Sequence, residues 1–293
     1  MKYSVVANWA DSLEIMTKRP FVMIPFLIAG FLEAVALELI YFSSGEPLGH
    51  IMNPIIKKFF GEAFAHFPGN LLIVPKLFFF AQVMITAVIG MFLTALTIYM
   101  ADQVIKRKAI NIKDALKKLS RRYVSIFIYA VLVIALGYFL KIIANIALHS
   151  IIRPMVSFLP RMIMKSMTFW LSSAIFLIMV CVNTFFILTI PILVVNGSSM
   201  ARCIGESIFR GGRNYITLCK TVCTPFLLYI PIIFLKAFST QLVRRTLPVS
   251  VLIVGIAGIF VIKYIECFVA ISATRFLLDT QKIKRRKRKG ASK

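Results

Sequence analysis

Six long apolar stretches limit what this chain can fold into more than any other feature of its sequence. They cover residues 21–42, 78–101, 123 to about 151, 167–195, 215–235 and 249–273. A helix rises about 1.5 Å per residue, so about 20 apolar residues cover the roughly 30 Å of hydrocarbon in a bilayer. Each stretch is long enough to cross, and the sequence therefore predicts a polytopic membrane protein.

The crossings should be helices rather than strands. Lipid offers no partner to backbone N–H and C=O groups, and the runs are too long and too continuously apolar for a transmembrane barrel. With 59% hydrophobic residues and no polar block large enough for a soluble core, residues 1–293 should form a single membrane domain. We predict an all-α fold with six transmembrane helices and a basic cytoplasmic tail over residues 282–293.

The orientation follows from the Lys and Arg residues in the connections. Eight of them lie between the second and third stretches and nine follow the last, whereas the connections on the other side hold three each. Because cytoplasmic loops carry the excess of Lys and Arg, both termini should be cytoplasmic. We expect a multi-pass protein of the inner (plasma) membrane, with anionic lipid headgroups as partners at its cationic face.

Short amphipathic helices are predicted before the first, third and fifth stretches. Residues 11–19 and 114–122 share an acid, a leucine, a hydroxyl and paired cations in the same order, and residues 202–213 are a looser copy. The apolar face of the first helix should be formed by Val5, Val6, Trp9, Leu13 and Met16.

These copies favour three helical hairpins with interfacial entry helices. The repeat units would be residues 1–105, 106–195 and 196–281. The alternative is that a basic amphipathic entry precedes many outward-going spans without any repeat.

Residues 191–213 carry a resemblance to a known group. A proline ends the fourth stretch, a short polar turn follows, and an amphipathic helix leads to a basic turn containing Gly211 and Gly212. This segment resembles the six-span membrane domain attached to some glycerophosphodiester phosphodiesterases and the related YciC-like bacterial inner-membrane proteins. The chain departs from the pattern at Asn196 and Gly197, where an acidic residue is common. Since it also lacks a phosphodiesterase domain, the resemblance implies fold and location but no hydrolase activity.

Charged residues inside the predicted spans are the candidate site, because each costs a few kcal/mol in lipid unless it is paired or hydrated. Counting the helical rise from the cytoplasmic ends puts opposite charges at equal depths. We predict that Glu33 pairs with Lys263 near the midplane, and Glu38 with Lys141 near the outer face. The candidate site is completed by Glu266 and Asn183.

Two roles fit such a polar layer. It could be a seam that holds the bundle together, since polar contacts between helices contribute up to about 1–2 kcal/mol in membranes. It could instead line a hydrated cavity for an ion, a proton or a lipid headgroup, with Glu33 and Glu266 as titrating groups and Lys263 as counter-ion.

The five cysteines do not form a disulfide framework. Cys219 and Cys223 are spaced four residues apart and could share a metal, but two thiols without nearby histidines make a poor site. We therefore expect buried apolar thiols and no metal or cofactor.

The sequence favours a non-enzymatic envelope or membrane-lipid accessory protein, since no catalytic motif is present. The first alternative is a small transporter or channel with the Glu/Lys site at its midplane. The second is a ribosome- or RNA-contacting factor acting through the basic run of residues 284–289, although no aromatic interleaving supports nucleic acid as a partner. A membrane-protein partner or a homo-oligomer is compatible with all three.

Overall fold

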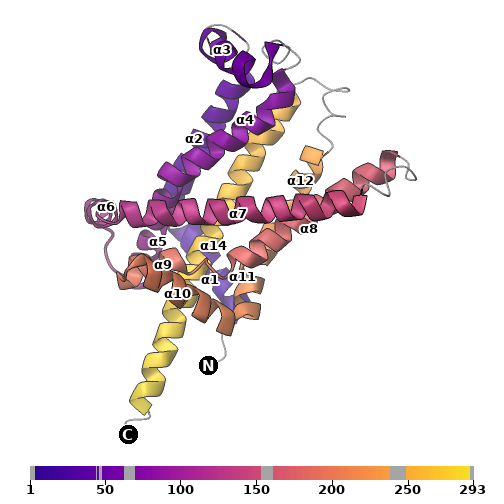
Figure 1. Cartoon of the computed structure of the whole chain (residues 1–293). Helices are drawn as coiled ribbons and strands as arrows, with labels where there is room; N and C mark the ends of the chain where they lie inside the picture. The colour runs from indigo at the N-terminus through magenta and orange to yellow at the C-terminus, as the bar shows by residue number, and fades with distance from the viewer. Residues whose placement is uncertain are drawn as a thin grey trace.

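The computed structural model describes residues 4–43, 45, 48–62, 70–152, 161–237 and 249–290. All regular structure in these ranges is helical, as the sequence predicts (Figure 1). The first part contains α1 (Val5–Lys18), η1 (Pro20–Met23), α2 (Ile24–Tyr41), α3 (Leu48–Phe60), α4 (Asn70–Ile85), η3 (Thr86–Gly90), α5 (Met91–Ile105) and α6 (Ile112–Ser120). The second contains α7 (Tyr123–Ile152), α8 (Arg161–Asn183), α9 (Thr189–Asn196), α10 (Met200–Arg213), α11 (Tyr215–Leu227), α12 (Ile230–Ala237) and α14 (Val249–Gly290).

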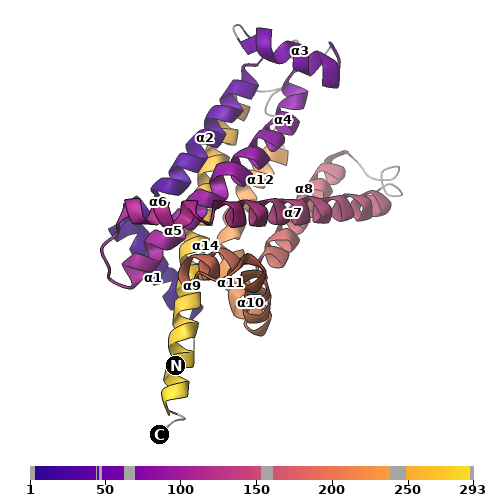
Figure 2. The ribbon, with the colours of Figure 1, turned by 60° about the vertical axis from the view of Figure 1, so that its left-hand side comes forward.

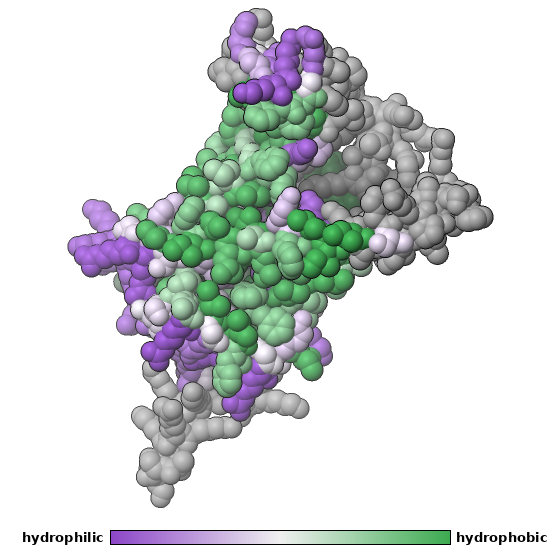
Figure 3. Space-filling model, in the orientation of Figure 1, coloured by the Kyte–Doolittle hydropathy of each residue, from purple (hydrophilic) through white to green (hydrophobic). Residues whose placement is uncertain are grey.

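Four helical segments within the described ranges are long and apolar enough to cross a membrane. They are Pro20–Tyr41, Ile73–Ile105, Tyr123–Ile143 and Leu252–Lys282. Large apolar side chains such as Phe31, Phe139 and Ile253 are exposed along them. Figure 3 shows the same pattern, with hydrophobic surface over the middle of the visible face and hydrophilic residues toward its upper and lower left ends. An exposed apolar surface of this extent is typical of contact with lipid.

The fourth and fifth stretches are not the continuous helices that we predicted. Residues 184–188 separate α8 from α9, and residues 228–229 separate α11 from α12. The physical reason is a proline just after each break: Pro191 and Pro231 have no N–H to donate to the carbonyl four residues earlier. Each stretch therefore contains two helices in place of one. Within α8, residues Ser173–Asn183 form an apolar segment that is shorter than a membrane span.

The helix α14 lies at the centre of the molecule and contacts α1, α2, α5, α9, α11 and α12. Figures 1 and 2 show α2 and α4 running beside the N-terminal part of α14, whereas α7 and α8 diverge from them. The predicted cytoplasmic elements α1, α10 and the C-terminal end of α14 lie toward the end opposite α3, whereas α6 lies near the middle, beside the start of α7.

Close approach of α2 and α14 depends on glycines. A Cβ atom added to Gly255 would lie 2.8 Å from Leu37 Cδ2, and one added to Gly30 would lie 3.3 Å from Lys263 Cγ. Small residues of this kind let two helices pack backbone to backbone in a membrane. The space left by the absent side chain of Gly30 is where the stem of Lys263 passes.

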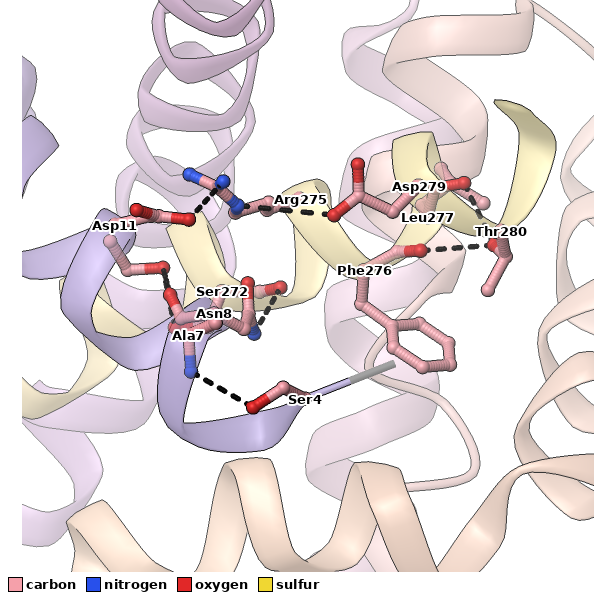
Figure 4. A network of polar contacts seen from close by, with 11 residues as sticks. Ser4, Ala7, Asn8, Asp11, Ser272, Arg275, Phe276, Leu277, Asp279 and Thr280 are labelled. Atoms are coloured by element: carbon pink, nitrogen blue, oxygen red, sulfur yellow. Dashed lines mark hydrogen bonds and ion pairs between the residues drawn. The ribbon is translucent and has the colours of Figure 1, made fainter. Parts of the chain in front are cut away.

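The N-terminal helix α1 packs against α14 through polar side chains (Figure 4). Ser12 and Asn8 are buried there: Ser272 Oγ donates to Ser12 Oγ at 3.0 Å, and Asn8 Nδ2 donates to the Ser272 carbonyl at 3.3 Å. Arg275 of α14 pairs with Asp11 beside them. This seam fixes α1 along the C-terminal half of α14.

The apolar face that we predicted for α1 contains both buried and exposed residues. Met16 is buried, but Val6 and Leu13 are exposed, and the polar residues of the seam face α14 instead. Small polar side chains allow closer helix contact and add hydrogen bonds. Exposed apolar residues such as Val6 and Leu13 are typical of a surface that contacts lipid.

The other two entry helices form where we predicted them. Each buries a short stripe of residues at helical spacing, Ala115 and Leu119 in α6 and Cys203, Ser207 and Gly211 in α10. At its C-terminal end α14 continues to Gly290, well past the predicted span end at residue 273, so the backbone of the basic tail is helical as far as the structure describes it.

Arg122 joins two of the predicted repeat units. Its guanidinium donates to the carbonyl oxygens of Leu193 at 2.6 Å and Gly197 at 3.0 Å, at the C-terminal end of α9. Gly197 ends α9 with φ 73°, a left-handed conformation that glycine adopts without strain. Here Gly197 and the cation of Arg122 end the helix, at the position where the resembling group commonly has an acid.

Candidate functional site

Lys263 of α14 is the centre of a buried charge network. Its Nζ lies 2.7 Å from Glu33 Oε1 on α2 and 3.1 Å from Glu266 Oε2 one turn along α14. Gln82 of α4 donates from Nε2 to the other oxygen of Glu33 at 2.9 Å. The structure thus brings together the first predicted pair, adds Glu266 to it, and recruits Gln82, which sequence reasoning missed.

Burial differs sharply across this network. Glu33 is 0% exposed and Lys263 5% exposed, whereas the side chain of Glu266 is 38% exposed. One ammonium between two carboxylates leaves a formal charge of −1, and the exposed member of the network is a carboxylate. The arrangement therefore presents a negatively charged oxygen next to an otherwise apolar interior.

The second predicted pair is wrong. Glu38 and Lys141 are both exposed, and they form no ion pair with each other among the described residues. Lys141 instead lies over the ring of Phe79, with Nζ 4.5 Å from the ring centroid. Equal predicted depth of Glu38 and Lys141 was not sufficient for an ion pair. Because α7 diverges from α2, Lys141 lies against α4 instead.

A cavity of about 200 Å³ adjoins the charge network. Lys263 and Glu266 line it together with Asn183, the fourth predicted site residue, while Glu33 lies outside its lining. The remaining lining is mainly apolar and comes from α2, the segment 86–98, α7, α8, α9, α11 and α14. All six predicted spans contribute residues to its wall, and the cavity is partly open where Asn183 is exposed.

The backbone around this cavity departs from the α-helix in two places. Residues Thr86–Gly90 form a π-helical turn between α4 and α5, and Thr86 and Gly90 line the cavity. π-Helical turns are uncommon and are frequent at functional sites. On the other side, Ile187 of the break between α8 and α9 lines the cavity as well.

Side-chain hydroxyls satisfy the carbonyl groups at that break. Tyr129 of α7 donates to the Phe186 carbonyl at 2.8 Å, and Ser207 of α10 donates to the Phe185 carbonyl, also at 2.8 Å. Non-helical backbone inside a membrane protein needs such partners, because no lipid atom replaces them. The irregular segment is held in place by neighbouring helices rather than being loose.

Some of this site was readable from the sequence. A proline inside the fourth stretch could have predicted the break at residues 184–188, and a lone Gln82 in an apolar run could have predicted a polar partner. The π-helical turn has no comparable signal, because Thr86, Gly90 and their neighbours also suit a regular helix.

Three thiols form a second cluster of metal-ligating type. Cys181 of α8 joins Cys219 and Cys223 of α11, with all three Sγ atoms within 4.8 Å of one another. We predicted apolar packing for the pair on α11; the third thiol, 38 residues earlier in the chain, could not be assigned to them from spacing.

Comparison with known proteins found no match. No family model, no curated protein and no solved structure matches this chain. The resemblance to the six-span domain therefore stays a prediction.

Proposed function

We propose that this chain is a non-enzymatic membrane protein that binds the headgroup of a membrane lipid in the cavity beside Lys263 and Glu266. The single observation that carries the proposal is a mainly apolar cavity with one charged network at its wall, inside a bundle of apolar helices. Amphipathic molecules need such a combination of apolar lining and a few placed polar groups.

The proposal includes six crossings with both termini cytoplasmic. Four crossings would be the long apolar segments, and the other two would be the broken pairs α8–α9 and α11–α12. Interrupted helices are found in membrane proteins where the irregular backbone lines a cavity or is buried in protein. The break at residues 184–188 meets the first condition through Ile187, and Thr184 and Leu188 at its ends are buried.

The chemistry of the network selects the headgroup. Its formal charge of −1 favours a positively charged group, and Glu266 supplies an exposed acceptor for N–H donors. A volume of about 200 Å³ suits a headgroup rather than a whole lipid, whose acyl chains would extend along the apolar outer faces of the helices. We therefore propose a primary-amine headgroup, such as that of phosphatidylethanolamine.

The test compares lipid retention by two variants with the same change of charge. Glu266→Gln removes the negative charge of the acceptor in the cavity, while Glu38→Gln removes the charge of an exposed carboxylate of α2 that lies outside the cavity lining. Losing a charge-assisted hydrogen bond costs about 1.5–3 kcal/mol, which is about tenfold or more in affinity. Native mass spectrometry of purified protein in nanodiscs should therefore show retained phosphatidylethanolamine falling by about that factor only in Glu266→Gln.

Phosphatidylcholine is the matched control ligand, because its quaternary nitrogen has no N–H to donate. Equal retention of both lipids by the wild-type protein, or equal loss in both variants, would contradict the proposal.

A transport role is the second candidate, and the two breaks in helices that surround the cavity favour it. Broken helices line substrate sites in many transporters, where they move during alternating access. Proton or amine flux into liposomes containing the purified protein, abolished in Glu266→Gln and retained in Glu38→Gln, would support transport over static binding.

A further inference from the structure

We propose that Cys181, Cys219 and Cys223 form a binding site for a thiophilic d¹⁰ metal ion, Zn²⁺ or Cu⁺. The site is independent of the lipid-binding proposal, because none of the three thiols lines the cavity. It is assembled from two helices, with Cys219 and Cys223 one turn apart on α11 and Cys181 on α8.

The sulfur positions are close to those of a metal–thiolate site. The three Sγ–Sγ distances are 3.4 Å for Cys219–Cys223, 3.6 Å for Cys181–Cys223 and 3.7 Å for Cys181–Cys219. Zinc–sulfur bonds of about 2.3 Å in tetrahedral geometry put two sulfurs about 3.8 Å apart. A small outward movement of each thiol would therefore admit an ion without rearranging the helices.

Neighbouring contacts hold α8 and α11 in register at this point. The Tyr215 hydroxyl donates to the Cys181 carbonyl at 3.2 Å, and the Tyr215 ring stacks on Phe185 with 4.6 Å between ring centroids. These contacts join the start of α11 to the end of α8 and to the break that follows it. The fold thus holds the sulfur of Cys181 beside the other two. A metal site needs ligands that are positioned in this way, whereas apolar packing of thiols does not.

The ligand type selects the ion. Thiolate ligands favour Cu⁺ and Zn²⁺ among biological metals, whereas hard cations such as Mg²⁺ prefer oxygen. Binding requires the thiolate form, so each of the three thiols releases its proton to solvent as its sulfur bonds to the metal. Three thiolates and Zn²⁺ carry a charge of −1, and with Cu⁺ the charge is −2. The thiols are half-buried, so water or another small ligand can complete the coordination of Zn²⁺.

The experiment uses the full-length protein in detergent with a non-chelating reductant. The protein is incubated with Zn²⁺ or with Cu⁺, passed through gel filtration, and analysed for metal by mass spectrometry. We expect the wild-type protein to retain one ion per chain. Cys181→Ser, Cys219→Ser and Cys223→Ser should each lose it, whereas the matched controls Cys203→Ser and Cys267→Ser, whose thiols are buried elsewhere, should keep it.

A second measurement uses only the wild-type protein, so misfolding of a variant cannot affect its result. The bound ion should protect all three thiols of the wild-type protein from alkylation by N-ethylmaleimide, as read by peptide mass spectrometry with and without a chelator. The proposal would be overturned by a wild-type protein that retains neither ion, by control variants that lose the metal equally, or by unprotected thiols in metal-loaded protein. The two arms with Zn²⁺ and Cu⁺ identify which ion binds more tightly.

Discussion

Removing Lys263 should destabilise the protein far more than removing its partner Glu33. In Lys263→Met, the fully buried Glu33 loses its counter-ion and lies near a second carboxylate, Glu266, while it keeps the hydrogen bond from Gln82. In Glu33→Gln, the ammonium of Lys263 still has Glu266 at 3.1 Å. The amide also keeps an oxygen that can accept from Gln82.

The magnitudes follow from this asymmetry. Leaving one buried charge without its partner costs about 3–5 kcal/mol, so Lys263→Met should lose about that much stability. Glu33→Gln exchanges a charge-assisted contact for a neutral one, which costs about 1–3 kcal/mol. The double variant has no buried carboxylate at this position. Its loss of stability should therefore be smaller than the sum of the losses in the two single variants, by at least about 1 kcal/mol.

The assay is thermal unfolding of the purified protein in detergent, followed through light scattering and the fluorescence of Trp9 and Trp170. Glu38→Gln is the control, because its carboxylate is exposed, and it should stay within about 0.5 kcal/mol of the wild type. Equal losses for Glu33→Gln and Lys263→Met, or additive losses in the double variant, would refute the interpretation of Lys263 as an ammonium shared by two carboxylates.

Three other regions give independent predictions. Gly255→Leu should lower Tm by the equivalent of about 1–3 kcal/mol, because its Cβ alone would lie 2.8 Å from Leu37 Cδ2. Arg122→Gln should cost about 1–3 kcal/mol by removing charged donors from the end of α9, while the exposed Arg121→Gln should stay within about 0.5 kcal/mol. Burial raises the pKa of the Cys203 thiol above 9.0, so at pH 7 it should react with N-ethylmaleimide more slowly in folded than in detergent-unfolded protein. Because the pKa of Cys203 is higher in the folded than in the unfolded protein, the unfolded thiol ionises first as the pH rises. The contribution of Cys203 to stability is therefore present below pH 9 and is lost above pH 9. A Tm that increases as the pH is raised above 9 would contradict this.

The sequence could predict the class of the fold because lipid permits so few backbone structures. Apolar runs of sufficient length gave the helices around Glu33 and Lys263, and helical rise alone matched the depths of these two residues. The predicted depth of a residue, however, does not tell toward which side of its helix the side chain points. It also does not tell whether two helices diverge. The predicted pair of Glu38 and Lys141 failed for that reason.

The parts that could not be predicted depend on contacts between distant segments. Gln82 joins Glu33 across 49 residues, and Cys181 joins the thiols of α11 across about 40. The apolar face of α1 was predicted from hydrophobic periodicity, which does not tell whether that face lies against lipid or against protein. In the structure Ser12 and Asn8 are buried against α14 with hydrogen bonds to Ser272, whereas Val6 and Leu13 are exposed.

The most direct measurement maps which side of the membrane each connection reaches. Short epitopes would be placed at both termini, after Arg107 and after Ser198, and also after Gly61 and within residues 153–160 and 238–248. Six crossings predict that the last three tags bind antibody in intact cells, while the other four bind only in inverted vesicles. A tag after Gly61 that shares the face of the termini, or a tag at 153–160 or 238–248 that is inaccessible from outside, would contradict the six crossings and the intramembrane position of the Lys263 network.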